Sequence, residues 1–275
     1  MTTDDTAVAA LGDGIAARVR PGVGENVLWV HGYSMDSSVW GELWRLLPEW
    51  EHIGIDLPGH GASRAIRPGE DLSALALSLG QLAHEQGARH LVALSFGTMV
   101  ALQIAVEYPD AFASLTLCAP ALAGGPEDAA AATRYAQLAR LHHDGGTGAE
   151  LAALWMRSPP DIFKGVDRRP ELRRRLADVI GRHSWRELAD GSMRLLTTPP
   201  QDLDRLRSIE AATLVVVGSE ELPAFRRCAE LIVGAIASSK RVELPAAGHL
   251  CLLEEPRQAA ALLRAHLRQW GRPLP

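Results

Sequence analysis

The chain has 275 residues, of which 47% are hydrophobic and 22% charged, and its formal net charge is −5. This is the composition of an ordinary globular protein, which excludes wholesale disorder and collagen-like structure. The mildly acidic balance gives no reason to expect nucleic acid as a partner.

The N-terminal segment and the cysteines both favour a cytoplasmic protein. Residues 1–6 are acidic where a secretory signal would be basic, and no apolar stretch of the sequence is long enough to cross a bilayer. The three cysteines, Cys118, Cys228 and Cys251, lack the spacing of a disulfide framework or of a zinc site. We therefore expect a reducing compartment, no membrane contact and no metal.

Short apolar runs alternate with longer amphipathic segments along most of the chain. An N-terminal hairpin over residues 7–20 is followed by a strand at 27–30, a helix at 39–47, a strand at 53–56, a helix at 72–86, a strand at 90–94, a helix at 97–107 and a strand at 115–119. The alternation resumes with a strand at 213–217, a helix at 224–236, a strand at 241–244 and a helix at 256–270. This order predicts an α/β fold with a mostly parallel sheet and helices on both faces.

Residues 121–204 interrupt this rhythm. Helical windows follow one another at 127–143, 149–156, 171–180 and 185–196, separated by Gly-Gly and Pro-Pro breakers. A helical stretch inserted between two strands of a parallel sheet is expected to form a lid over the edge where such sheets bind ligands. We therefore divide the chain into a first core part at 1–120, a helical lid at 121–204 and a second core part at 205–275.

Four motifs follow predicted strands, where the loops of a parallel sheet converge. They are His-Gly-Tyr at the start of 31–40, Asp-Leu-Pro-Gly-His-Gly-Ala-Ser at 56–63, Ala-Leu-Ser-Phe-Gly at 93–97, and the segment 247–256 with Gly-His near its start. Ser95 lies between a strand and a helix, with the small residues Ala93 and Gly97 two positions away on either side. Such a tight turn pushes the hydroxyl out above the sheet. A serine becomes a good nucleophile only when a base takes its proton, and His249 is the candidate base.

Together these motifs resemble those of the α/β-hydrolase family, over essentially the whole chain outside the lid. The resemblance implies the α/β-hydrolase fold, with Ser95 as nucleophile and His249 as base. It places the acid three residues after Gly218, at Glu221, with the neighbouring Glu220 as the alternative. The chain order of serine, acid and histidine is the family's order.

The sequence also departs from the family pattern. Ala93 replaces the usual first glycine of the serine motif, and a glutamate stands where the family usually has an aspartate. Leu94 replaces the histidine of many relatives, which makes the serine motif similar to that of enol-lactonases and some methyl esterases. These departures leave room for a reaction other than hydrolysis.

The resemblance further implies roles outside the three catalytic side chains. The backbone N–H groups of Tyr33 and Phe96 are expected to form the oxyanion hole, whereas Asp56 and His60 are expected to shape a turn. In the lid, Trp155, Phe163 and Trp185 are expected to line an apolar substrate pocket, unless they only pack the lid onto the core.

The remaining features have plainer interpretations. The arginines at 168–169 and 173–175 predict a solvated helix face, with docking of an acidic carrier protein as the alternative. Cys251 is expected to be a buried thiol, because no base spacing points to it.

We therefore expect a serine hydrolase that cleaves a carboxylic ester, lactone or thioester of a small apolar substrate through an acyl-enzyme, without a cofactor. Two alternatives stay open. The same residues would serve a lyase, cyclase or perhydrolase of this family, and a hydrolase-fold protein can retain the pocket to bind a ligand without turnover. The sequence does not indicate the oligomeric state.

Overall fold

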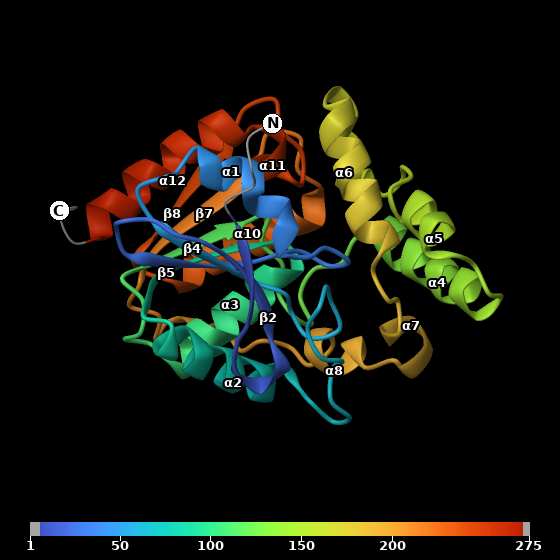
Figure 1. The fold of residues 1–275 in the computed structure, drawn as a ribbon, viewed down its shortest axis with the longest axis horizontal. Helices are drawn as coiled ribbons and strands as arrows, with labels where there is room; N and C mark the ends of the chain where they lie inside the picture. Colours follow the sequence, from blue (N-terminus) through green and yellow to red (C-terminus); the bar gives the residue numbers. More distant parts are fainter. Residues whose placement is uncertain (1–5, 272–275) are drawn as a thin grey trace.

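A computed structural model describes residues 6–271, and at its centre lies an eight-stranded sheet (Figure 1). The strands are β1 (Ala7–Ala10), β2 (Ala16–Arg20), β3 (Asn26–Val30), β4 (Glu51–Ile55), β5 (Ala88–Leu94), β6 (Ser114–Cys118), β7 (Ala212–Gly218) and β8 (Ser239–Leu244). Their order is β1-β2-β4-β3-β5-β6-β7-β8. β2 is antiparallel to both β1 and β4, whereas all pairs from β4 onward are parallel. The predicted mostly parallel sheet is confirmed, and the N-terminal hairpin forms β1 and β2.

Alternate residues of the central strands face opposite sides of the sheet, and each side has its own core. In β3, Leu28 and Val30 pack on one side, whereas Val27 and Trp29 pack on the other. The first side is covered by α2 (Leu72–Glu85), α3 (Phe96–Glu107) and α10 (Pro223–Ala235), and the second by α1 (Gly41–Arg45), α11 (Cys251–Glu254) and α12 (Pro256–Trp270). Figure 1 shows α2 and α3 on one face of the sheet and α1 and α12 on the other. Burial on both faces explains why the central strands read as continuous apolar runs.

Several core helices begin at the residues that the sequence pattern marks. Asp71 caps α2 by accepting the N–H of Ala74 at 2.8 Å, and prolines open α10 and α12. The helix expected at 39–47 is instead a 3-10 turn, η2 (Ser37–Trp40), followed by the short α1. Within residues 6–271, no helix combines the length and the apolar character that crossing a membrane requires.

The segment between β6 and β7 is helical and stands to one side of the sheet (Figure 1). Its elements are α4 (Ala129–His143), α5 (Gly148–Trp155), η3 (Asp161–Arg168), α6 (Pro170–Gly181), α7 (Glu187–Asp190), α8 (Met193–Thr197) and α9 (Leu203–Leu206). The prediction of a single helix at 185–196 is wrong. Gly191 adopts φ 65°, a left-handed conformation that ends α7 before α8 begins. The sequence pattern also missed η3. We call this helical segment the lid, and its limits at 121 and 204 stay a prediction.

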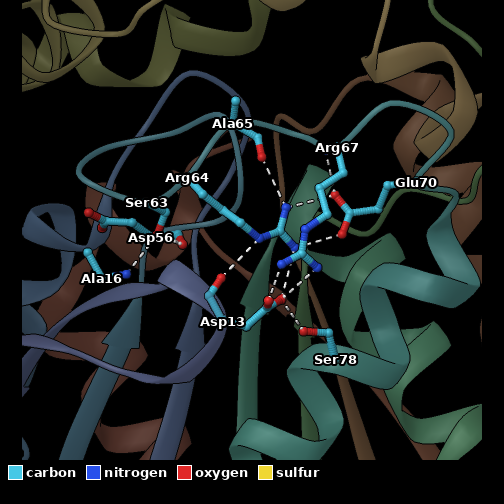
Figure 2. A network of polar contacts seen from close by, with 9 residues as sticks. All are labelled: Asp13, Ala16, Asp56, Ser63, Arg64, Ala65, Arg67, Glu70 and Ser78. Atoms are coloured by element: carbon cyan, nitrogen blue, oxygen red, sulfur yellow. Dashed lines mark hydrogen bonds and ion pairs between the residues drawn. The ribbon is translucent and has the colours of Figure 1, made fainter.

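A polar network ties the N-terminal hairpin to the loop after β4 and to α2 (Figure 2). Its centre is Asp13, in the 3-10 turn η1 (Gly12–Gly14). The Asp13 carboxylate accepts from Arg64 at 3.1 Å and from Ser78 at 2.7 Å, and it also pairs with Arg67. Hydrogen bonds from Arg67 and Ser78 lower the pKa of Asp13 to about 2. The network thereby fastens the N-terminal hairpin to the loop after β4 and to the helix α2.

Candidate active site

Ser95 lies between β5 and α3 in a strained backbone conformation. Its φ of 52° and ψ of −123° are rarely adopted by a residue with a side chain. Two backbone hydrogen bonds stabilise this strained conformation. The Ser95 N–H donates to the Cys118 carbonyl at 2.9 Å, and the Ser95 carbonyl accepts from the Thr98 N–H at 2.8 Å. The predicted strand–serine–helix turn is therefore present.

The two small residues of this turn have different surroundings. A Cβ atom on Gly97 would lie 2.5 Å from the His31 carbonyl oxygen and 2.7 Å from that of Val30, so α3 packs directly on the end of β3. Ala93, which replaces the usual glycine, is fully buried in β5, and its methyl group belongs to the core on the α2–α3 side. Of the two positions, 93 and 97, it is Gly97 that leaves no room for a side chain.

His249 connects the serine to a carboxylate. Its Nε2 lies 2.8 Å from Ser95 Oγ, and its Nδ1 lies 2.9 Å from Glu221 Oε1. The ring is 1% exposed and packs against Phe225, with the ring centres 4.1 Å apart. Because a carboxylate accepts hydrogen bonds, Nδ1 carries the proton and Nε2 is free to accept the hydrogen of Ser95.

The loop after β7 separates the two candidate acids. The Glu221 side chain is fully buried and accepts the Leu222 N–H at 2.9 Å as well as the imidazole. The Glu220 side chain is 47% exposed and binds Arg168 of the lid at 2.9 Å. Gly218 makes this geometry possible, since a Cβ there would collide with the carbonyl oxygens of Ala247 and Gly248. The structure brings only Glu221 to His249.

The loop that carries His249 is held by a second buried carboxylate. Glu254 accepts the N–H of Gly248 at 2.6 Å and that of Leu250 at 3.0 Å, so it grips the backbone on both sides of the histidine. Burial raises the pKa of Glu254. Arg168 of the lid reaches the same loop, donating to the Ala246 carbonyl at 2.7 Å. Glu254 lies within the predicted segment 247–256, but neither its backbone contacts nor the arginine contact was predicted.

The loop after β3 lies directly against the serine. A Cβ on Gly32 would meet the Cβ of Ser95 at 3.4 Å. His31 fixes the loop base, because its Nε2 accepts the Leu57 N–H at 3.0 Å while its Nδ1 donates to the Gly32 carbonyl at 2.8 Å. The N–H groups of Tyr33 and Phe96 donate to no other atom of the described part of the chain.

A cavity of about 400 Å³ opens above Ser95 and His249, between the core and the lid. Most of its lining is apolar or aromatic and comes from both parts: Tyr33, Met35, Phe96, Met99, Leu122, Tyr135, Trp155, Ile162, Phe163, Met193, Phe225 and Leu250. Charged side chains also line it, namely Glu127, Asp128 and Arg194. This volume and lining are typical of a site for a small apolar molecule.

The three predicted pocket residues have different surroundings in the structure. Trp155 and Phe163 line the cavity, as we expected. Trp185 does not: it is 1% exposed, and its ring packs at 4.8 Å on His183 and at 6.1 Å on Tyr33. Trp185 thus follows the stated alternative, because it packs the lid onto the core and does not line the cavity wall. The contributions of Tyr135 and Phe225 were missed, since neither residue belongs to a recognisable motif.

Two other predicted residues have structural contacts. The Asp56 carboxylate accepts the backbone N–H groups of Ser37 at 2.8 Å and Ala62 at 2.9 Å, which shapes the turn after β4. His60 is buried beside His183, with ring centres 4.6 Å apart, and burial lowers its pKa well below the usual value. Neither residue lines the cavity.

The arginines of the lid are largely paired. Arg168 binds Glu220, Arg173 binds Asp167, and Arg169 and Arg175 share Glu42 of α1 at 2.8 and 2.7 Å. Most of the basic run therefore attaches the lid to the core.

Cys251 is buried, with its sulfur 3.0 Å from that of Cys118. The contact with Cys118 and burial raise the pKa of the Cys251 thiol well above its usual value. A thiol that stays protonated is a poor nucleophile, in agreement with the prediction.

Within residues 6–271, no three His, Cys, Asp or Glu side chains come together as a metal site would require. The expectation of no metal and no cofactor stays a prediction.

Comparison with known proteins gives a family and a set of relatives. The family model described as "Alpha/beta hydrolase family" matches residues 27–262. The monoacylglycerol lipase abhd6-B of Xenopus laevis is 26% identical over 277 aligned positions, which cover 90% of this chain and 76% of that protein. A thermophilic esterase from Thermogutta terrifontis has a TM-score of 0.78 at 25% identity, over 97% of this chain and 99% of that one. The esterase EaEST from Exiguobacterium antarcticum shares the fold, with a TM-score of 0.79 at 19% identity over 95% of this chain and 99% of its own.

Proposed function

The chain belongs to the alpha/beta hydrolase family and is a hydrolase of the esterase or lipase type. Within that class we propose that it is a serine hydrolase that cleaves a carboxylic ester, lactone or thioester of a small apolar substrate through an acyl-enzyme. The single observation that carries this proposal is the unbroken contact from Ser95 Oγ to His249 Nε2, at 2.8 Å, and from His249 Nδ1 to Glu221, at 2.9 Å.

In the first half of the reaction, Ser95 Oγ attacks the substrate carbonyl carbon while His249 Nε2 takes the hydroxyl proton. The imidazole becomes positively charged, and the Glu221 carboxylate stabilises that charge and holds the ring orientation. When the tetrahedral intermediate collapses, His249 gives the proton to the leaving oxygen or sulfur, and the acyl group stays on Ser95. In the second half, His249 takes a proton from water, and the water oxygen attacks the acyl carbon. His249 then returns the proton to Ser95 Oγ as the bond to the acyl group breaks, which releases the carboxylic acid and restores the free enzyme.

The negative oxygen of the tetrahedral intermediate needs hydrogen-bond donors that are not already occupied. The N–H groups of Tyr33 and Phe96 fit this need, because neither donates within the described part of the chain and both residues line the cavity above Ser95. Removing one such donor from a related kind of site costs about 3 kcal/mol or more of transition-state stabilisation. We assign the oxyanion hole to these two groups.

The cavity supports an apolar acyl or alcohol group in the substrate. Trp155 and Phe163 of the lid and Met99 and Leu250 of the core all line this cavity of about 400 Å³, and its wall is mainly hydrocarbon and aromatic. The relatives named as a lipase and as esterases agree with such a substrate. A lipid ester or another small apolar ester is therefore the class of substrate that we propose.

The test is an ester, lactone and thioester panel run on the wild type and on Ser95→Ala, with Ser208→Ala as a control at an exposed serine. We expect Ser95→Ala to lower kcat by about 10⁴-fold or more, and Ser208→Ala to behave as the wild type. A fluorophosphonate should label the wild type at Ser95, and mass spectrometry should find a substrate-derived acyl group there. Labelling that persists in Ser95→Ala would refute the proposal. Turnover without an acyl group would favour a non-hydrolytic reaction, and stoichiometric ligand binding without turnover would favour a binding protein.

A further inference from the structure

The side chain of Tyr33 is anchored in the lid, although its backbone belongs to the core. The Tyr33 hydroxyl donates to Glu187 Oε1 at 2.7 Å, across 154 positions of sequence. Glu187 opens α7 and is only 3% exposed. His183, also in the lid, contacts the same carboxylate oxygen at 3.0 Å. Tyr33 is therefore held by a part-buried hydrogen bond that requires the lid to be seated on the core.

Lid side chains also surround the ring of Tyr33. Their ring centres lie 5.5 to 6.1 Å from that of Tyr33, and they belong to Tyr135 of α4, Trp155 of α5, and His183 and Trp185 before α7. The core contributes His60, at 5.9 Å. Aromatic pairs at these separations attract one another and restrict ring movement. The position of the Tyr33 ring is thus set mainly by the lid.

The backbone of the same residue borders the serine. The Tyr33 carbonyl accepts the Ser34 hydroxyl at 2.7 Å, and Ser34 has φ of 61°, which makes the turn tight. Gly32 lies against Ser95, as described above. Side chain and peptide share one Cα atom, so fixing the ring restricts the movement of the peptide whose N–H we assign to the oxyanion hole. A hydrogen-bond donor loses most of its effect when it turns away from its acceptor.

We propose that Glu187 is a positioning residue for the oxyanion hole: by holding the Tyr33 hydroxyl it fixes the Tyr33 N–H, so the hole is complete only when the lid is seated. This inference rests on the proposed function, and it makes the lid a part of the catalytic machinery as well as a cover. A substrate that brings the lid onto the core would thereby assemble the site that attacks it.

The charges of the two partners agree with this arrangement. Burial disfavours ionisation of Glu187, yet hydrogen bonds from His183 and Tyr33 leave its pKa below the usual value. Burial and the Glu187 charge raise the pKa of Tyr33 well above its usual value. The carboxylate is therefore the acceptor and the neutral hydroxyl the donor, which is the stronger, charge-assisted form of hydrogen bond.

The experiment compares Tyr33→Phe, Glu187→Ala and the double variant with the wild type. Each is assayed for kcat and KM on a p-nitrophenyl ester, and for inhibition by phenylboronic acid, whose serine adduct places an oxygen in the oxyanion hole. We expect each single variant to lower kcat by about 10- to 100-fold and to weaken the inhibitor by a similar factor, with KM within about threefold. The double variant should be no worse than either single variant, because both remove the same contact. Glu187→Gln keeps an acceptor for the hydroxyl and should recover most of the loss.

The matched control is Glu42→Ala, which cuts a different tie between lid and core, the one to Arg169 and Arg175. It should leave kcat and inhibitor binding unchanged. Equal losses in Glu42→Ala and Glu187→Ala would overturn the proposal, because general loosening of the lid would explain both. So would wild-type kcat in Tyr33→Phe, a variant that removes one oxygen atom and therefore remains informative if Glu187→Ala fails to fold. A wild type without ester turnover and without labelling of Ser95 would instead refute the proposed function itself.

Discussion

The substitution Glu221→Gln tests whether this residue is the acid of the catalytic site, because it replaces the carboxylate by an amide of the same size. Glu221→Gln removes one charge beside His249 and keeps the hydrogen-bond geometry. With the partners 2.9 Å apart and an effective dielectric constant of about 20, a carboxylate attracts a charged imidazole by about 6 kcal/mol. The neutral hydrogen bond that the amide can retain is worth about 1 kcal/mol.

The difference of about 5 kcal/mol corresponds to a fall in kcat of several thousandfold. The assay is hydrolysis of a p-nitrophenyl ester under saturating substrate, with stability checked by thermal unfolding. Glu220→Gln is the control, because it makes the same exchange one residue away, in a side chain that is 47% exposed and bound to Arg168. The reasoning fails if Glu221→Gln loses less than about tenfold, or if the Glu220 variant loses as much.

Two predictions concern stability. Gly97→Ala should lower the free energy of unfolding by about 1–3 kcal/mol, because the new Cβ would lie 2.5 Å from a carbonyl oxygen. Gly234→Ala should raise the free energy of unfolding by up to about 1 kcal/mol, because its new Cβ would meet no atom within 4 Å apart from the backbone of its own helix and its chain neighbours. Urea unfolding measures both changes, and equal effects would contradict the packing argument. Stability should also fall as the pH drops from about 6.5 towards 4, because burial lowers the pKa of His52 to about 4 and the unfolded chain takes up the proton first. Between pH 7 and 5, the free energy of unfolding of His52→Gln should therefore fall by about 2 kcal/mol less than that of the wild type. The control His84→Gln, at an exposed position, should match the wild type. Identical falls in all three proteins would refute this origin of the pH dependence.

The sequence pattern predicted the fold well where successive residues of a strand are all buried or where a capping residue marks the start of a helix. The central strands are buried on both faces, so their apolar runs are unmistakable, and capping residues such as Asp71 mark helix starts. Ser95 and His249 were identified because the turn and the loop that carry them have characteristic neighbours. Their contact, at 2.8 Å, follows from parallel strands that end at one edge of the sheet.

What could not be predicted depends on side-chain direction and on packing between distant segments. The family resemblance favoured Glu221 and kept the adjacent Glu220 as an alternative, and only the backbone path after Gly218 shows that Glu221 turns towards the histidine and Glu220 towards solvent. Trp185 was expected either in the pocket or between lid and core, and its aromatic character could not decide between them; in the structure it packs between lid and core. The contact of Glu187 with Tyr33 spans 154 positions and leaves no periodic or local trace.

The pairing of β6 with β7 has a consequence for how the chain is made. These neighbouring strands are joined through the whole lid, so one edge of β6 has no strand partner until residue 212 has left the ribosome. Closing so long a loop is slow compared with forming local contacts. Glu221 and His249 are synthesised later still. A product that terminates before residue 221 therefore displays Ser95 without Glu221 or His249, and the contacts on which the proposed ester cleavage depends cannot form before residue 249 has been synthesised.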